Sequence, residues 1–266
     1  MSVRIHRTAI VSPRAKIGED VVIGEYAVIR DGVCIGDGVE VGSHALIEGR
    51  TTIGSGTKIF HGAAIGMPPQ DLKYRGEDTE LIVGRNNVIR EFASLHRGTA
   101  KGKGKTIIGD GNFIMAYVHI AHDCVLGNNI IISNATNLGG HVEIGDTAVI
   151  GGMVAVHQFV HIGRGAMIGA ASLVLQDVLP FALASGNPAK IYDINRVGMR
   201  RKDFPRSTID AIHKAVFIAT RKGLSIDNAM KRIEGEFFKI PEIEEILQFI
   251  KNRSRRGIMR GDRVVV

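Results

Sequence analysis

Residues 15–36, AKIGEDVVIGEYAVIRDGVCIG, carry an aliphatic residue at every sixth position, and this spacing decides the fold. The same spacing extends over residues 5–65, 83–95 and 108–174. Six residues turn an α-helix through roughly 600°, so a helix cannot keep every sixth residue on one face. A strand of period 2 can, if the chain turns after each short strand. The sequence therefore predicts a mainly β fold, in which three hexapeptides form one triangular coil and the coils stack into a parallel β-helix.

Small residues and glycines accompany the repeat. A mostly small residue, such as Ala27, stands two places before each aliphatic residue, and we expect it to fill the interior beside that residue. Glycine often follows the aliphatic residue directly, as Gly24 and Gly36 do. We expect these glycines to serve the corners of the coil, where the backbone needs a positive φ.

The chain divides into two expected domains. Residues 1–190 are expected to form the β-helix, with two interruptions of the repeat, residues 67–80 and 97–105, projecting from it as loops. Residues 191–266 change to helical spacing and are expected to form a small helical domain at one end of the prism. The residues that delimit its helices are two candidate N-caps, a helix end and a helix start: Ser207, Ser225, Gly223 and Pro241.

The composition excludes several classes of protein. The 266 residues include 33 Gly, two Cys and no Trp, with 44% hydrophobic and 23% charged residues, which argues against a disordered chain. No stretch approaches the ~20 consecutive apolar residues that span a membrane. Two cysteines cannot form a disulfide framework, and the first residues lack the apolar segment of a signal peptide. We therefore expect a cytoplasmic protein without stable membrane insertion.

Charge is unevenly distributed along the chain. Residues 1–189 hold 16 basic and 17 acidic side chains, whereas residues 190–266 hold 18 basic and 10 acidic ones, a net charge of +8. Such a region can attract nucleic acid, an acidic membrane surface or an acidic protein, or it can simply be a solvated helical surface. Nucleic acid is disfavoured because the basic region lacks interleaved aromatic residues.

Histidines are concentrated in the second half of the repeat. Six of the ten lie between residues 96 and 161, and none occupies an inward position of the repeat: His96, His119, His122, His141, His157 and His161. We expect them on the outer faces or corners, where any single one is also compatible with a surface or packing role. Because a coil takes about 18 residues, His122, His141 and His157 are expected near one edge on successive coils. Imidazole titrates near pH 6.5, which suits a general base at neutral pH.

Six short motifs together resemble those of one family. They are QDLKY (70–74), LHRG (95–98), HIAHDC (119–124), GGHV (139–142), IGGMVAVHQF (150–159) and QDV (176–178). In combination they resemble the acyl-[acyl-carrier-protein]–UDP-N-acetylglucosamine O-acyltransferases, hexapeptide acyltransferases that start lipid A biosynthesis. The resemblance implies a left-handed β-helix and a homotrimer with active sites between subunits. It also implies a reaction that needs neither a metal nor another cofactor. The expected activity is transfer of a 3-hydroxyacyl chain from acyl carrier protein to the 3-hydroxyl of UDP-N-acetylglucosamine, and the basic region could then steer the acidic carrier protein.

The resemblance also assigns roles to residues of this chain. His122 matches the general base, and the backbone N–H of Gly140 matches the donor to the oxyanion. The matching substrate-binding residues are Asp71 and Lys73 at the sugar, His119, His141 and His157 in the same cleft, and Gln158, Asn195 and Arg201 near the uridine diphosphate. Ala170 and Pro188 stand where the family measures acyl length, and Val197 stands where it commonly has an acid. Either Asp71 or Asp123 is a candidate to orient His122.

Several alternatives remain open from the sequence. The acceptor could be a 3-amino sugar nucleotide, which would make the reaction an N-acylation. A sugar acetyltransferase that uses acetyl-CoA shares the repeat, and a γ-class carbonic anhydrase shares the fold but binds zinc through three histidines. A non-catalytic scaffold would not need the histidine cluster.

Overall fold

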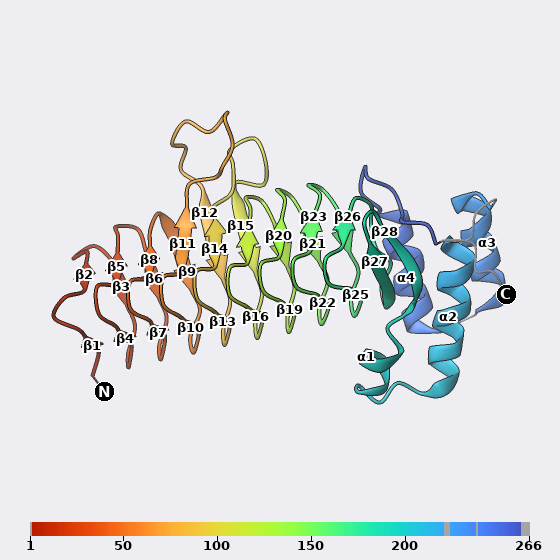
Figure 1. Ribbon diagram of the computed structural model, residues 1–266, viewed down its shortest axis with the longest axis horizontal. Helices are drawn as coiled ribbons and strands as arrows, with labels where there is room; N and C mark the ends of the chain where they lie inside the picture. Colours follow the sequence, from red (N-terminus) through yellow and green to blue (C-terminus); the bar gives the residue numbers. More distant parts are fainter. Residues whose placement is uncertain (1, 221–223, 238, 262–266) are drawn as a thin grey trace.

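The computed structural model describes residues 2–220, 224–237 and 239–261, and shows a long three-sided prism with helices at its C-terminal end (Figure 1). Sheet A consists of β1 (Arg4–Ile5), β4 (Val22–Ile23), β7 (Glu40–Val41), β10 (Lys58–Ile59), β13 (Val88–Ile89), β16 (Phe113–Ile114), β19 (Ile131–Ile132), β22 (Val149–Ile150), β25 (Met167–Ile168), β27 (Ala182–Gly186) and β28 (Ala189–Ile194). Sheet B consists of β2 (Ile10–Val11), β5 (Val28–Ile29), β8 (Leu46–Ile47), β11 (Ala64–Met67), β14 (Ser94–His96), β17 (His119–Ile120), β20 (Asn137–Leu138), β23 (Ala155–Val156) and β26 (Leu173–Val174). Sheet C consists of β3 (Lys16–Ile17), β6 (Cys34–Ile35), β9 (Arg50–Ile53), β12 (Glu80–Val83), β15 (Lys105–Ile108), β18 (Val125–Leu126), β21 (Glu143–Ile144) and β24 (His161–Ile162).

The strands pair in parallel with a register of one coil. His119 lies beside Asn137, for example, and Asn137 beside Ala155, eighteen residues further along in each case. The aliphatic residues of the repeat and the small residues two places before them point inward, and Ile29 and Ala27 are fully buried. The expectation of a mainly β fold built from hexapeptides is confirmed. We call the three corners of the prism the A–B, B–C and C–A edges, after the sheets that they join.

The role predicted for the glycines that follow the aliphatic residues is wrong for most of them. Gly24 and Gly36 do not have a positive φ, which falls instead two residues later at the corner, on Tyr26 (56°) and Gly38 (64°) respectively; Gly66 (79°) does have one. The glycines are needed because neighbouring coils stack closely. A Cβ on Gly36 would lie 2.8 Å from the backbone nitrogen of Ser55 in the next coil, closer than real Cβ contacts allow.

Both interruptions of the repeat project from the B–C edge. Residues 68–79 connect β11 to β12, and residues 97–104 connect β14 to β15 (Figure 1). On sheet C the register is kept across them, because Arg50 pairs with Glu80, and Glu80 with Lys105, whereas on sheet B it shifts between Ile65 and Met67 where the first loop begins. The insertions therefore change the B–C edge without disturbing the core.

The C-terminal part begins with the antiparallel hairpin of β27 and β28, and its four helices are α1 (Arg196–Arg200), α2 (Arg206–Thr220), α3 (Ile226–Glu236) and α4 (Pro241–Lys251). Ser225 caps α3 by accepting a hydrogen bond from the Asn228 N–H, and Pro241 begins α4, both as predicted. Ser207 is not a cap, because α2 already begins one residue earlier, and the short α1 is not among the predicted helices. Gly223 lies outside the described residues, and the division of the chain at residue 190 stays a prediction.

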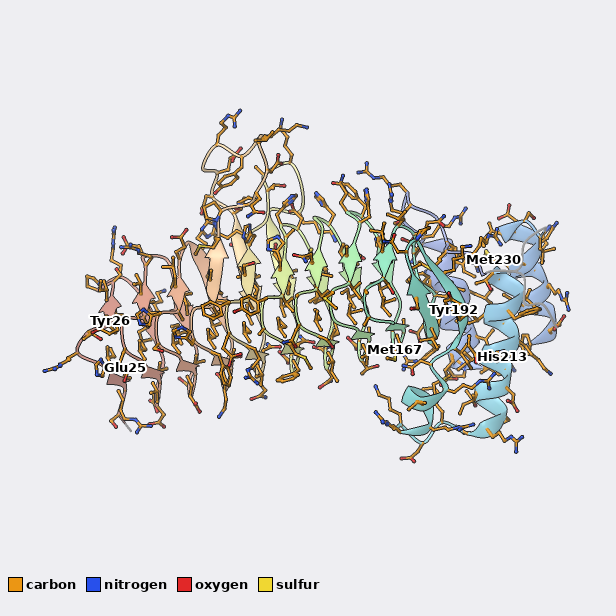
Figure 2. The ribbon with its side chains drawn as sticks, viewed as in Figure 1. Glu25, Tyr26, Met167, Tyr192, His213 and Met230 are labelled. Carbon is orange, nitrogen blue, oxygen red and sulfur yellow. The ribbon has the colours of Figure 1, made fainter. Side chains whose placement is uncertain are left out.

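Helix α2 packs against β28, where Figure 2 shows Tyr192 of the strand and His213 of the helix. His213 Nε2 lies 3.5 Å from Asp193 Oδ1 at this junction. Among the described residues, none of the helices has the length and apolar character that crossing a bilayer requires.

Candidate active site

A histidine and a buried carboxylate form the centre of the B–C edge. His122 and Asp123 occupy the corner between β17 and β18, and His122 Nδ1 lies 2.8 Å from Asp123 Oδ2. Asp123 has a φ of 60°, which turns its side chain back toward the ring of His122. Between the two residues that the sequence offered to orient His122, the structure therefore selects Asp123.

The second projecting loop surrounds Asp123. The N–H and the hydroxyl of Thr99 and the N–H of Lys103 all donate hydrogen bonds to its carboxylate. Gly102 lies so close that a Cβ there would be 2.5 Å from the carboxylate carbon. Burial alone would raise the pKa of Asp123, but the hydrogen bonds from His122 and Thr99 outweigh it and lower the pKa to about 2. Asp123 is therefore an acceptor at neutral pH, which places a proton on Nδ1 of neutral His122 and leaves Nε2 free to accept one.

A second histidine stacks on the first, as the spacing predicted. The rings of His122 and His141 meet edge to face with centroids 5.2 Å apart, and His141 Nε2 lies 3.7 Å from Asp123 Oδ2. The next position of the stack belongs to Phe159, whose ring lies 4.5 Å from that of His141, and not to His157. His157 lies two residues before Phe159 in the same corner, between β23 and β24, so it is on the expected edge although its ring is not part of the stack.

Two further histidines lie on sheet B next to this corner. His119 Nδ1 lies 2.8 Å from Ser94 Oγ, and its ring meets the ring of His96 edge to face at 4.8 Å. His96 is only 5% exposed, contrary to the expectation of an outer position, because it stands at the base of the projecting loops. Burial, followed by the positive charge of His119, lowers the pKa of His96 to about 4. Burial also lowers the pKa of His119.

Gly140 packs directly against the catalytic candidate. A Cβ on Gly140 would lie 2.6 Å from Cε1 and 2.8 Å from Nε2 of His122, so only glycine fits beside the ring. Its carbonyl accepts a hydrogen bond from the Phe159 N–H, while within the described residues its own N–H donates none. An unpaired N–H beside a basic nitrogen is an arrangement that can stabilise an oxyanion.

Asp71 and Lys73 lie in the first projecting loop. The Lys73 N–H donates to Asp71 Oδ1, and the neighbouring Leu72 is 96% exposed. Arg97 anchors the loop by donating to the Gly66 carbonyl and to the Tyr74 hydroxyl. Among the hydrogen bonds and ion pairs of the described chain, none joins Asp71 or Lys73 to the histidines.

The residues expected at the nucleotide do not gather on one edge. Gln158 is exposed on the B–C edge, one residue before Phe159. Asn195 is buried at the C–A edge, where its Nδ2 donates to the Gly165 carbonyl and its Oδ1 accepts from Gly198 at the start of α1. Arg201 follows α1 and is exposed, and Figure 1 shows α1 on the opposite side of the prism from the loops. Val197, within α1, is 58% exposed.

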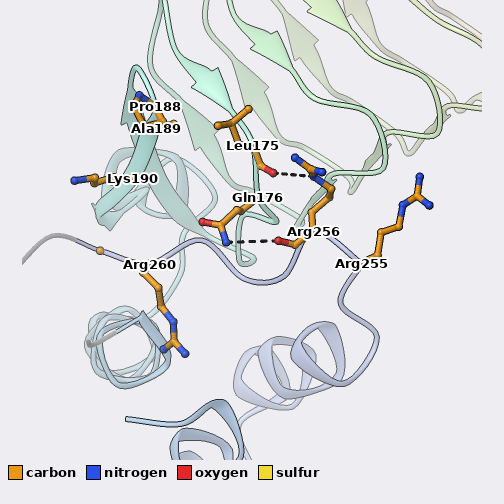
Figure 3. Close-up of a pocket in the computed structure, with 9 residues that line it drawn as sticks. Leu175, Gln176, Pro188, Ala189, Lys190, Arg255, Arg256 and Arg260 are labelled. Carbon is orange, nitrogen blue, oxygen red and sulfur yellow. Dashed lines mark hydrogen bonds between the residues drawn. The ribbon is translucent and has the colours of Figure 1, made fainter. Parts of the chain in front are cut away.

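The two residues expected to measure acyl length lie in neighbouring segments, because the Gly186 N–H donates to Ser172 Oγ, which itself donates to the Gly169 carbonyl. Ala170 is exposed on the A–B edge between β25 and β26. Pro188, in the turn of the β27–β28 hairpin, lines a recess of about 470 Å³ together with Leu175, Gln176 and four basic side chains (Figure 3). The basic residues of this recess are Lys190, Arg255, Arg256 and Arg260.

One group of the described residues has the donor chemistry of a metal site. Ligand atoms of His122, Asp123 and His141 lie within 4.8 Å of one another. The carboxylate already accepts hydrogen bonds from His122, Thr99 and Lys103. We therefore interpret the group as a hydrogen-bonded network and assign no metal to it.

Sequence reasoning missed Thr99, Gly102 and Phe159. The loop that holds Thr99 and Gly102 breaks the repeat, so no spacing rule relates it to Asp123. Phe159 was accessible from the sequence, because it lies eighteen residues after His141.

Two family models and many relatives match this chain. A model of the bacterial transferase hexapeptide (six repeats) matches residues 14–49 and 105–140, and a model of domain 2 of UDP-N-acetylglucosamine O-acyltransferase matches residues 177–259. The acyl-[acyl-carrier-protein]–UDP-N-acetylglucosamine O-acyltransferases of Thermodesulfovibrio yellowstonii and Thiobacillus denitrificans are 50% and 48% identical to this chain. Each match covers 96% of this chain and 99% of the relative.

Solved structures resemble the chain over the same length. The UDP-N-acetylglucosamine acyltransferase from Campylobacter jejuni superposes with a TM-score of 0.90 at 42% identity, over 97% of this chain and 99% of its own. The enzyme of that name from Bacteroides fragilis superposes with a TM-score of 0.93 at 41% identity, over 96% of this chain and 100% of its own. The left-handed parallel β-helix expected for this sequence is thereby confirmed.

Proposed function

Because the chain belongs to the family of acyl-[acyl-carrier-protein]–UDP-N-acetylglucosamine O-acyltransferases, we propose that His122 is the general base of that acyl transfer. The acyl chain, a 3-hydroxyacyl group, moves from acyl carrier protein to the 3-hydroxyl of UDP-N-acetylglucosamine, which is the first step of lipid A biosynthesis. The observation that carries the assignment of the base is the 2.8 Å contact of His122 Nδ1 with the buried carboxylate of Asp123.

The proposed reaction follows from the state of this dyad. Nε2 of His122 removes the proton from the sugar 3-hydroxyl, and the oxygen attacks the thioester carbonyl of the donor. The oxyanion of the tetrahedral intermediate accepts a hydrogen bond from the Gly140 N–H. Collapse of the intermediate breaks the carbon–sulfur bond, and the departing thiolate takes the proton back from His122. Asp123 stabilises the imidazolium that exists between the two proton transfers.

The remaining residues divide between two edges, which supports a homotrimer with active sites between subunits. Asp71, Lys73, His119, His141, His157 and Gln158 lie on or beside the B–C edge with the base, where we propose that they hold the sugar and line the cleft. Asn195 and Arg201 lie near the C–A edge, so they reach a nucleotide at the B–C edge only if that nucleotide sits against a second copy. A guanidinium such as that of Arg201 suits a diphosphate.

Two further assignments concern the acyl donor and the acyl chain that it carries. We propose that the basic C-terminal region attracts the acidic acyl carrier protein, and that Ala170 and Pro188 face the end of the acyl chain. The enzyme is proposed to work in the cytoplasm, where its nucleotide and carrier-protein substrates are available.

Replacement of the base tests this proposal. His122→Ala is expected to lower kcat about 10²- to 10⁴-fold in an assay of UDP-N-acetylglucosamine with 3-hydroxyacyl carrier protein, because proton removal is lost. His61→Ala is the matched control, since His61, like His122, directly precedes the residue of positive φ in its corner, here Gly62 on the A–B edge. We expect it to keep at least half of the activity. Turnover of His122→Ala close to that of the control would refute the assignment, and light scattering of both variants tests the trimer separately.

A further inference from the structure

The stack of rings on the B–C edge continues beyond His141. Phe159 lies parallel to His141, with 9° between the ring planes. Cζ of Arg255 lies 3.4 Å from the centroid of the Phe159 ring. His122, His141, Phe159 and Arg255 therefore form one continuous column, in which three members come from successive coils and the fourth from the segment that follows α4.

A buried carboxylate holds this segment in place. The N–H and the hydroxyl of Ser254 donate to Asp177, each at 2.6 Å, and Asp177 is fully buried. On the other side of Arg255, the Asp177 N–H donates to the Gly257 carbonyl, and the Met259 N–H donates to the Asp177 carbonyl. The backbone on both sides of Arg255 is thus tied to the last coil, and Arg255 extends from it over the Phe159 ring.

We propose that Arg255 is a positioning residue for the acyl transfer, because its guanidinium clamps Phe159 and so fixes the ring of His141 against the ring of His122. The proposal rests on the proposed role of His122 as general base. A guanidinium over an aromatic face is attracted by the negative charge density of that face, and its planar shape allows close stacking.

The charges around His141 agree with this arrangement. Burial lowers the pKa of His141, and the charges of His122, Lys103 and Arg255 lower it further, whereas Asp123 raises it. Arg255 is thus one of the charges that favour a neutral His141 beside the base.

Arg255 also lines the basic recess, so attraction of an acidic donor is the competing explanation. In Figure 3 the side chains of Arg255 and Arg256 extend toward the coils, whereas Arg260 extends toward a helix. Arg256 is held by a hydrogen bond to the Leu175 carbonyl. A role in charge attraction predicts a higher KM for the carrier-protein donor, whereas a role in positioning predicts a lower kcat.

A pair of charge-matched variants separates the two explanations. Arg255→Leu and Arg253→Leu remove the same charge from the same segment, and Arg253 is exposed and donates only to the Ile250 carbonyl. We expect both to raise the KM for acyl carrier protein to a similar extent, and only Arg255→Leu to lower kcat, by about two- to fivefold. Arg255→Lys should restore part of that loss, because an ammonium keeps the cation over the ring but not the planar contact. Thermal unfolding of the two leucine variants should give the same midpoint.

A double-mutant cycle completes the test. Phe159→Leu breaks the same column without a change in charge, so Arg255→Leu should lower kcat no further when Phe159→Leu is already present. Equal kcat values for Arg255→Leu and Arg253→Leu, or full additivity with Phe159→Leu, would overturn the proposal. The cycle is measured against active wild-type enzyme, so its failure leaves the role of His122 standing. The proposed role of His122 as general base would be refuted separately, by a His122→Ala variant that remains active.

Discussion

Two edges of this prism carry stacks of rings, and they differ in almost every other property. On the A–B edge, Tyr26, His44, His61, Phe92 and Tyr117 stack in sequence with centroids 5.0–5.4 Å apart. Most of these rings face outward, and Figure 2 shows Tyr26 near the N-terminal end of the prism. On the B–C edge, His122 and His141 also stack, but their side chains are only 17% and 20% exposed.

The difference lies in what surrounds the rings. The A–B stack has no buried carboxylate among the described residues, and the nearest polar partner of His61 is the Ser43 hydroxyl. The B–C stack has Asp123, which the loop of residues 97–104 encloses. Stacking of corner residues is thus a property of the repeat, whereas a proton-accepting site requires an enclosed acid as well.

Replacing Asp123 by a neutral side chain should have the largest effect, because it removes the buried charge that distinguishes the B–C edge from the A–B edge. Asp123→Asn keeps the size of the side chain but can donate a hydrogen bond to His122 Nδ1, which shifts the proton to Nε2. We expect kcat, measured with both substrates saturating, to fall about 10³-fold, which lies within the range for general-base catalysis. Activity within fivefold of wild type would show that the carboxylate is dispensable.

Crowding the base should have the next largest effect. The added methyl group of Gly140→Ala would meet the ring of His122, which must move by a large part of an ångström. Because displacement of a reacting group on this scale costs up to about 10² in rate, we expect kcat to fall by one to two orders of magnitude. The corner glycine Gly152 meets its nearest atom only at 3.3 Å. Gly152→Ala is therefore the control, and an equal loss in both variants would contradict the proposed contact.

The buried rings of the B–C edge should make stability depend on pH. The pKa of His96 is about 4 in the folded protein, below its ordinary value of 6.5. Unfolding therefore takes up a proton as the pH falls from about 6.5 to 4, and stability is lost over that window. The loss should approach about 3 kcal/mol for this group, and His96→Gln should remove it. Asp123, with a pKa of about 2, adds a further loss only as the pH falls from about 4 to 2.

Urea unfolding at pH 7.5 and pH 4.5 measures this dependence. His44→Gln is a suitable comparison from the A–B edge, and it should leave the difference between the two pH values unchanged. A wild-type protein whose free energy of unfolding is the same at both pH values would contradict the burial of neutral His96.

The smallest effect is expected on the A–B edge itself. Tyr26→Ala removes the first ring of that stack, which is 57% exposed. We expect a loss of about 0.5–1.5 kcal/mol in the free energy of unfolding, as for other aromatic pairs, with kcat unchanged within twofold. A loss of kcat above tenfold would mean that this edge takes part in the reaction and that the contrast between the edges is wrong.

Most of the fold and part of the site follow from the sequence. A strict six-residue repeat allows only one arrangement of Ile29, Ile47 and Ile65, because each must return to the same face. The repeat also brings His122 and His141 to the same edge on successive coils, although they are nineteen and not eighteen residues apart. The contact of Asp123 with Thr99 does not follow from the sequence, because the loop that carries Thr99 obeys no repeat. The place of Arg255 depends on where the chain returns after α4, which is fixed by hydrogen bonds to the last coil such as those of Asp177 and Leu175, and no repeat predicts them.

The unbroken register of sheet C across both insertions has a consequence for how this scaffold can change. Strand partners on sheet C are 30 and 25 residues apart at the insertions instead of the usual 18, yet the aliphatic column inside continues without a shift. The number of residues in the loops can therefore vary at this corner, whereas the inward positions within the strands are fixed. New substrate contacts can be gained here by lengthening or shortening a segment, with no need to redesign the interior that supports it.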